Sequence, residues 1–123
     1  MPGADDLHAF IRATFRSVWA IELLCHLRAR RAEALAPDEI VAALRASNLI
    51  VEQGLADLIA AGLVVTEASG LMRYAPANPH LEHLAAEAEA LYARSPDAVR
   101  RMIVASANPG ISAFADAFKL RRD

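Results

Sequence analysis

Two small groups of side chains in this sequence are of types that could do chemistry. His80 and His83 lie three residues apart at the start of an expected helix, so both imidazoles could share one face and bind a metal ion. Two histidines are too few for such a site, and Cys25 and His26 are distant in sequence. Histidines at a helix end or on the surface are the simpler interpretation, so no metal site is predicted.

Cys25 and His26 are neighbours, and neighbouring side chains on a helix point in different directions. A thiolate–imidazole pair between them is therefore not expected, and Cys25 is predicted to be a small buried hydrophobe. The sequence also has no glycine-rich phosphate loop, no nucleophile elbow and no HExxH helix. We predict no catalytic residue, no cofactor and no enzymatic activity.

The length and composition of the sequence are those of one globular domain. A chain of 123 residues with 55% hydrophobic and 23% charged residues can bury a real core and is not disordered. The net charge of −2 does not indicate a nucleic-acid partner, although a local basic patch could still bind one. A single cysteine, no signal-like start and no long apolar run favour a cytoplasmic protein without a membrane segment. The bias towards arginine and alanine suggests a GC-rich genome and hence a bacterium.

Residues 5–32 contain no glycine or proline, and apolar residues recur there at three- and four-residue steps, which predicts helix. The segment can be one long helix or two, with Ser17 capping the second. Two are favoured, because an unbroken helix of about 28 residues is rare in a compact domain. Phe10, Phe15 and Trp19 could line a ligand pocket, but core packing is the commoner role of aromatic residues at this spacing.

Residues 37–76 are predicted to form two short helices followed by a β-hairpin. Pro37 fits the first position of one helix, and Ser47 and Asn48 are strong caps for the next. Gly62 is expected to end that second helix. Its inward-facing residues are predicted to be Val51, Leu55, Leu58 and Ile59.

Two further features of this segment carry predictions. Gly54 lies inside the second helix, where it costs helix stability, and it can mark a close approach of another backbone. The runs at 64–68 and 71–75 are β-branched or aromatic and are separated by Ser69 and Gly70, which predicts the hairpin.

Residues 79–123 are predicted to be helical again, with apolar strips along 81–92 and 111–118. These strips can form either an intramolecular core or the seam of a dimer. Two-fold dimers are the commonest oligomers, so a homodimer is predicted. The predicted fold class is mainly α with a small β-hairpin, in a single domain of N-terminal helices (5–32), a central unit (37–76) and C-terminal helices (79–123).

The stretch 37–76 resembles winged helix-turn-helix transcriptional regulators of the MarR-like and PadR-like groups, above all in the sequence from Leu58 to Val64. The segments 17–24 and 114–121 also look like small winged-helix proteins of alphaproteobacteria. The resemblance implies a second helix that enters the major groove of DNA and a hairpin that touches the DNA backbone. The residues it implies at the interface are Ser47, Asn48, Glu52 and Gln53, with Asp57 as a further candidate, Arg45 before the helix and Arg73 on the hairpin.

The charge of this unit opposes the DNA interpretation. Phosphate contacts supply much of the affinity for DNA, yet five acids and one arginine lie between Asp38 and Glu67, which gives a net charge of −4. Arginines elsewhere could supply the missing cations, namely Arg12, Arg16, Arg28, Arg30, Arg31 and Arg73. Leu49, Ile50 and Val51 are consecutive, so at least one of them is expected to face outward, unless Leu49 or Ile50 packs under the hairpin.

These observations lead to two functional predictions. The first is a winged-helix transcriptional regulator that binds DNA as a homodimer. The alternative is a winged-helix protein-interaction module with little DNA affinity, which contacts a protein partner through Leu49 and Ile50.

Overall fold

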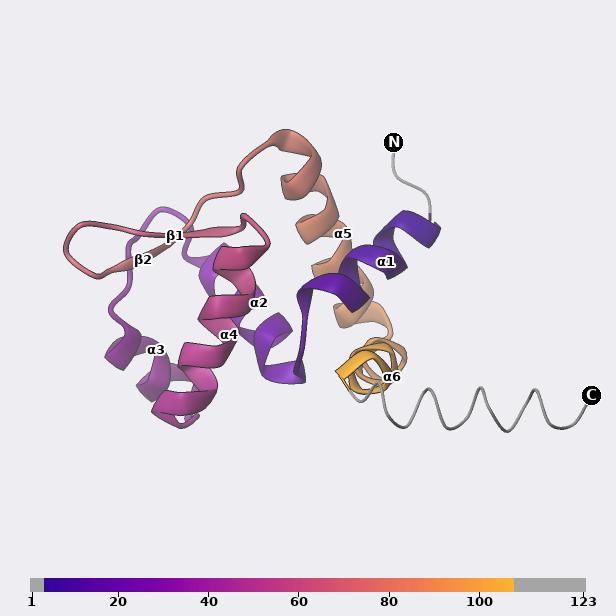
Figure 1. Ribbon diagram of the computed structural model, residues 1–123, viewed down its shortest axis with the longest axis horizontal. Helices are drawn as coiled ribbons and strands as arrows, with labels where there is room; N and C mark the ends of the chain where they lie inside the picture. Colours follow the sequence, from indigo (N-terminus) through magenta and orange to yellow (C-terminus); the bar gives the residue numbers. More distant parts are fainter. Residues whose placement is uncertain (1–3, 108–123) are drawn as a thin grey trace, which may run out of the picture.

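The computed structural model describes residues 4–107 of the chain, and within this range it contains six helices and one hairpin (Figure 1). The predicted fold class, mainly α with a small hairpin, is confirmed. The first half of the chain forms α1 (Ala4–Thr14), α2 (Val18–Ala29), α3 (Pro37–Leu44) and α4 (Asn48–Ala60).

The second half begins with the antiparallel strands β1 (Val64–Thr66) and β2 (Met72–Tyr74) and continues into α5 (Pro79–Arg94) and α6 (Pro96–Ala107). Val64 lies opposite Tyr74 in the ladder. Leu35, in the connection between α2 and α3, forms an isolated antiparallel bridge with Met72 through two backbone hydrogen bonds of 2.7 and 2.8 Å. The hairpin is therefore paired with a segment well before it in sequence.

The N-terminal segment forms two helices, as favoured from the sequence. Ser17 occupies the cap position of α2 in an extended backbone conformation, but its side chain makes no capping hydrogen bond, so only its position was predicted. Phe15 is fully buried between the two helices' ends and meets Phe10 edge-on, with ring centroids 6.0 Å apart. Both phenylalanines thus serve the core.

The turn between α3 and α4 is built by local capping. Arg45 adopts a left-handed backbone conformation, with φ 55°, which ends α3. The Ser47 hydroxyl then accepts a hydrogen bond of 3.1 Å from the Ile50 N–H, as a cap of α4. The helix ends at Ala60, and Gly62, just past its end, has a φ of 79° that suits glycine.

The face that α4 turns inward differs from the prediction at one position. Val51, Leu55 and Leu58 are buried, but Ile59 is 41% exposed, so its assignment to the inward face was wrong. Gly54 is also buried, and a Cβ atom there would lie 2.2 Å from Leu23 Cδ1. The missing side chain leaves room for the Leu23 side chain of α2, whereas the nearest backbone atom, Ala20 Cα, would lie 3.7 Å from that Cβ. The close approach at Gly54 is therefore to a side chain and not to another backbone, as had been expected.

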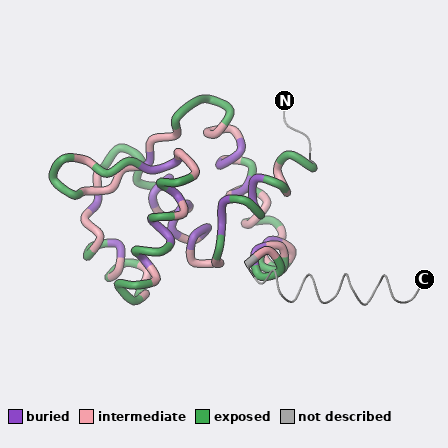
Figure 2. Tube along the Cα trace, in the orientation of Figure 1, coloured by how far each residue is buried: buried purple, intermediate pink, exposed green. Residues whose placement is uncertain are grey.

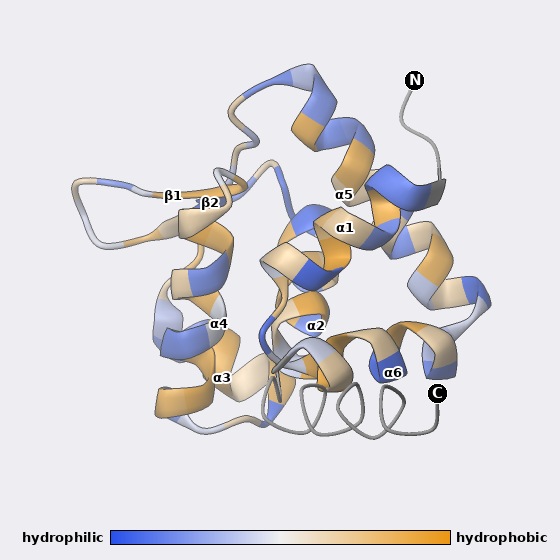
Figure 3. Ribbon diagram, turned by 45° about the vertical axis from the view of Figure 1, so that its right-hand side comes forward, coloured by the Kyte–Doolittle hydropathy of each residue, from blue (hydrophilic) through white to orange (hydrophobic). Residues whose placement is uncertain are grey.

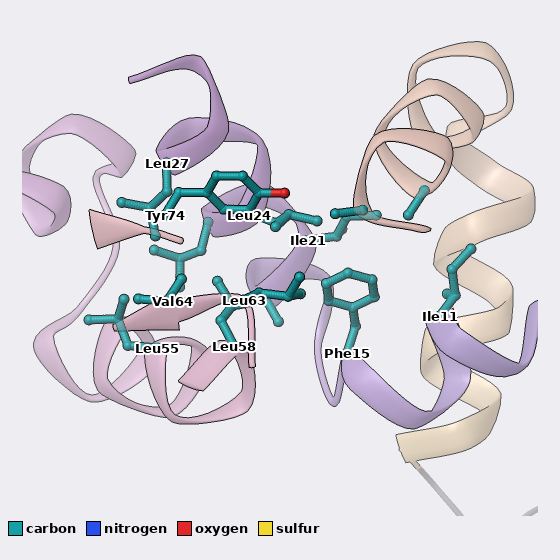
Figure 4. Close-up of a cluster of buried hydrophobic side chains, with 14 of the residues drawn as sticks. Ile11, Phe15, Ile21, Leu24, Leu27, Leu55, Leu58, Leu63, Val64 and Tyr74 are labelled. Atoms are coloured by element: carbon teal, nitrogen blue, oxygen red, sulfur yellow. The ribbon is translucent and has the colours of Figure 1, made fainter. Parts of the chain in front are cut away.

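The buried core runs through the centre of the molecule, while the tip of the hairpin is largely exposed (Figure 2). Helix α2 lies at its middle and contacts α4, β2, α5 and α6. Around it, α1, α5 and α6 each carry both hydrophobic and hydrophilic residues (Figure 3). Figure 4 shows Tyr74, Leu24 and Val64 gathered from β2, α2 and β1 in one apolar cluster.

The C-terminal helices use their apolar strips within the protein. Leu84, Ala85 and Ala88 of α5 are buried in the core, and so are Val99 and Ile103 of α6. Of the two roles left open for the strip at 81–92, the intramolecular core is the one the structure supports. The predicted helix at 111–118 lies outside the described residues.

Candidate functional site

The outer face of α4 carries the polar residues that the sequence singled out. Asn48, Glu52 and Gln53 are all exposed on this helix. Ser47 is also exposed at its start, but its hydroxyl is engaged in capping. Arg45 is exposed in the preceding turn. The structure therefore brings these five predicted residues together along one helix and its first turn.

Arg73, the sixth predicted residue, is engaged within the hairpin and with a neighbouring loop. Its Nε lies 3.4 Å from Glu67 Oε2, and its Nη1 donates a hydrogen bond of 3.3 Å to the Ala32 carbonyl. The guanidinium thus holds the hairpin to the end of the α2–α3 connection. Glu67 offsets its charge, so less of that charge is available to a ligand.

Arg16, one of the arginines that could supply the missing cations, lies beside α4. Asp57 accepts a hydrogen bond of 3.3 Å from the Arg16 backbone N–H, and Arg16 Nε lies 3.8 Å from its other oxygen. The Arg16 side chain remains 86% exposed. Arg16 and Gln53 line the same open hollow. The position of Arg16 depends on how the connection between α1 and α2 packs against α4, which the sequence spacing does not reveal.

The same face also presents apolar side chains. Leu49 is 60% exposed, whereas Ile50 is partly buried and Val51 is fully buried. The prediction that one of the three faces outward is confirmed, and the alternative that Leu49 packs under the hairpin is excluded. With Ile59, the outer face of α4 therefore carries two large exposed hydrophobic residues.

A second cluster lies behind the hairpin, around Arg28. Its side chain is only 6% exposed and is held by three groups from distant parts of the chain. The guanidinium donates to Tyr74 Oη at 3.2 Å, to Glu82 Oε1 at 3.0 Å and to Glu89 Oε1. Tyr74 in turn donates its O–H to the other oxygen of Glu82. We refer to Arg28, Tyr74, Glu82 and Glu89 as the arginine cluster.

The arginine cluster corrects two interpretations drawn from the sequence. Arg28 was counted among the arginines that could face DNA, but it is buried and fully paired, so of the arginines at 28–31 only Arg30 and Arg31 are exposed. Opposite the apolar strip at 81–92, Glu82 and Glu89 would be expected on the outer side of α5, but both turn towards Arg28. Helix periodicity did not identify them, because their partner belongs to another helix.

The environment shifts the pKa values of the groups in and beside the cluster. Burial and the hydrogen bond to Glu82 raise the pKa of Tyr74 to about 12. Burial acts to raise the pKa of Glu82, but hydrogen bonds from Tyr74 and Arg28 and the charges of Arg28 and Arg31 outweigh it, so that pKa is lowered. Burial and the nearby Glu89 raise the pKa of the Cys25 thiol to about 12. At neutral pH the thiol is protonated and is a poor nucleophile.

The remaining candidates for chemistry show no built site. His83 Nε2 lies 4.0 Å from Glu87, and His80 is exposed. Among residues 4–107, no three histidine, cysteine or acidic side chains are grouped so that they could hold a metal ion. Over the same residues, no helix has both the length and the apolar character needed to cross a membrane.

Comparison with known proteins gives no relative from which a function could be carried over. No protein-family model, curated protein or solved structure matches the chain. The outer face of α4, with Arg45 and Arg16 at its sides, brings exposed amide, carboxylate and guanidinium groups together.

Proposed function

We propose that the chain is a winged helix-turn-helix protein that regulates transcription by binding DNA through α4. The order of elements supports the fold: α2, a bridged strand residue at Leu35, α3, α4 and the hairpin. One observation carries the function. The exposed polar residues of α4 lie between two exposed arginines, Arg45 before its first turn and Arg16 beside its second half.

The side chains on this face have the chemistry for reading base edges. Asn48 and Gln53 are amides that can pair with adenine in the major groove, and Glu52 can accept a hydrogen bond from the cytosine amine. Arg45 and Arg16 can contact the phosphates on either side of the groove. Because Asp57 already draws on Arg16, the electrostatic contribution is small, and the affinity of the proposed complex should fall only moderately as the salt concentration rises.

The test is fluorescence anisotropy with DNA from upstream of the protein's own gene, titrated at several salt concentrations. If each arginine neutralises one phosphate, the slope of log K against log salt is about −2 per protomer, and about −4 for a homodimer. Arg45→Ala is expected to reduce that slope by about 1 per protomer without changing sequence preference. Arg101→Ala, at an exposed position on α6, is the matched control and should change neither quantity.

Gln53→Ala separates sequence reading from charge. We expect it to cost about 1 to 3 kcal/mol on the preferred sequence and to reduce discrimination between sequences. Arg73→Ala is a less informative probe, because it also disturbs the hairpin. Absence of binding at low salt, or affinity that does not respond to salt, would refute the DNA proposal.

The exposed hydrophobic residues favour a second candidate, a protein partner that covers Leu49 and Ile59. Leu49→Glu is expected to abolish capture of such a partner while the fold is kept. Val104→Glu is the control, because Val104 is similarly exposed at 53% but lies on α6. If both variants capture the same partners as the wild type, the second candidate is wrong.

Homodimerisation is retained within the proposal. The strip at 81–92 is used by the protomer's own core, so a seam between protomers would have to use other residues, such as the segment 111–118 beyond the described residues. Light scattering coupled to size-exclusion chromatography measures this directly. A monomer at all concentrations would remove the dimer from the proposal.

A further inference from the structure

An open hollow between α2 and α3 lies apart from the residues proposed to read DNA. It is lined by Val18, Trp19 and Glu22 of α2 and by Ala43 and Leu44 of α3. Its volume is about 500 Å³, which is the size of many small-molecule sites. Val18 and Leu44 pack their other sides against the hydrophobic core.

The lining of this hollow specifies the charge of a ligand. Four of the five residues are apolar, and Glu22 is the fifth and the only charged one. Indole is the aromatic ring that binds cations best, and here Trp19 and Glu22 line the same hollow. An anionic ligand would be repelled by Glu22, and a purely apolar one would leave the carboxylate without a new partner.

We propose that this hollow binds an amphipathic organic cation, namely a small aromatic or aliphatic amine. The ammonium group pairs with Glu22, and the apolar body lies on Trp19 and Leu44. This inference is independent of the DNA proposal, because it uses none of the residues on the outer face of α4.

Glu22 also connects the hollow to the C-terminal helices. Its Oε1 accepts a hydrogen bond of 2.6 Å from the Tyr92 hydroxyl of α5. Arg100 of α6 lies next to Tyr92, with its Nη2 3.4 Å from the hydroxyl, and its own charge is paired with Asp97 at 3.2 Å. An ammonium group bound to Glu22 competes with the Tyr92 hydroxyl for the Glu22 carboxylate. Binding in the hollow therefore weakens the contact between α2 and α5.

Trp19 is the only tryptophan in the chain, so its fluorescence reports on the hollow directly. The full chain is titrated with phenethylammonium, with 2-phenylethanol as the neutral analogue and 3-phenylpropionate as the anionic one. We expect the cation to bind roughly tenfold more tightly than the alcohol, the factor given by one charge-assisted hydrogen bond. The anion is expected to bind more weakly than the alcohol.

Variants assign the preference to Glu22. Glu22→Gln should remove the tenfold advantage of the cation and leave binding of the alcohol unchanged, which also shows that the hollow is intact. Glu87→Gln makes the same charge change at an exposed position of α5 and should leave all three affinities unchanged. Tyr92→Phe should tighten binding of the cation, because the carboxylate loses a competing donor.

Three results would overturn the proposal. The first is equal affinity for cation and alcohol in the wild type. The second is a preference for the cation that survives in Glu22→Gln. The third is binding that disappears as protein concentration rises, which would show that a second copy of the chain covers the hollow instead.

Discussion

Arg28 is the only buried charged residue among those whose exposure the structure describes, and its partners come from two other elements. Burial of a charge is costly unless every hydrogen-bonding group is satisfied. Here Tyr74, Glu82 and Glu89 satisfy it, and no buried side-chain nitrogen or oxygen in the described residues lacks a partner. The arginine cluster therefore fixes the base of the hairpin against α2 and α5.

Replacing Arg28 tests this role. Arg28→Met leaves two carboxylates and a phenol without their shared donor, and we expect a loss of about 3 kcal/mol in the free energy of unfolding. Arg31→Met is the matched control, because Arg31 also contacts Glu82, at 3.3 Å, but is exposed; its cost is expected to stay below about 1 kcal/mol. Urea unfolding measures both, and equal losses would contradict a special role for Arg28.

The raised pKa values of Tyr74 and Cys25 predict instability in alkali. Their pKa values rise from 10.0 and 9.0 to about 12 on folding, so the folded protein keeps protons that the unfolded chain releases. Their contribution to stability is complete below pH 9 and is lost as the pH rises towards 12. Unfolding free energies measured from pH 8 to 11 should fall more steeply for the wild type than for Tyr74→Phe. Parallel curves would show that Tyr74 is not responsible.

At the scale of elements, the ends of helices could be predicted from the sequence, whereas the contacts between one element and another could not. Pro37 and Gly62 through their backbones, and Ser47 through its hydroxyl, determine where helices start and stop. These signals are local, so the sequence predicted those boundaries. Ile59 was assigned wrongly because it lies at the edge of the inward stripe, where the packing of α4 decides exposure. Arg28 was missed because its partners lie 46 to 61 residues away. The position of Arg16 beside α4 was missed for the same reason.

The crossing of α2 and α4 depends on Gly54. Alanine there would gain about 1 kcal/mol of helix propensity, but its Cβ would lie 2.2 Å from Leu23 Cδ1. We expect Gly54→Ala to destabilise the protein by about 1 to 3 kcal/mol, as overpacked cores do. In a Leu23→Ala background the same change should be neutral or stabilising. A double-mutant cycle by thermal unfolding checks this coupling, and additive effects would argue against the close crossing.

At the scale of the whole molecule, the helical end and the hairpin end share one core. Ile103 of α6 is fully buried, whereas its neighbour Val104 is exposed. We expect Ile103→Ala to cost about 2 to 5 kcal/mol and Val104→Ala less than about 0.5 kcal/mol. Because Trp19 lies on α2, its fluorescence and the far-ultraviolet circular dichroism should report one shared transition for Ile103→Ala. Separate transitions would show that the two ends unfold independently.

The spacing within the arginine cluster has a consequence for synthesis on the ribosome. Arg28 emerges first, and Glu89 follows 61 residues later, so a growing chain holds a guanidinium that has no carboxylate to meet. Until α5 has left the exit tunnel, the face of α2 that carries Arg28 stays hydrated, and the base of the hairpin is not held against α5. Stalled nascent chains that end before residue 89 are therefore expected to remain protease-sensitive, with protection arising only once the C-terminal helices are free.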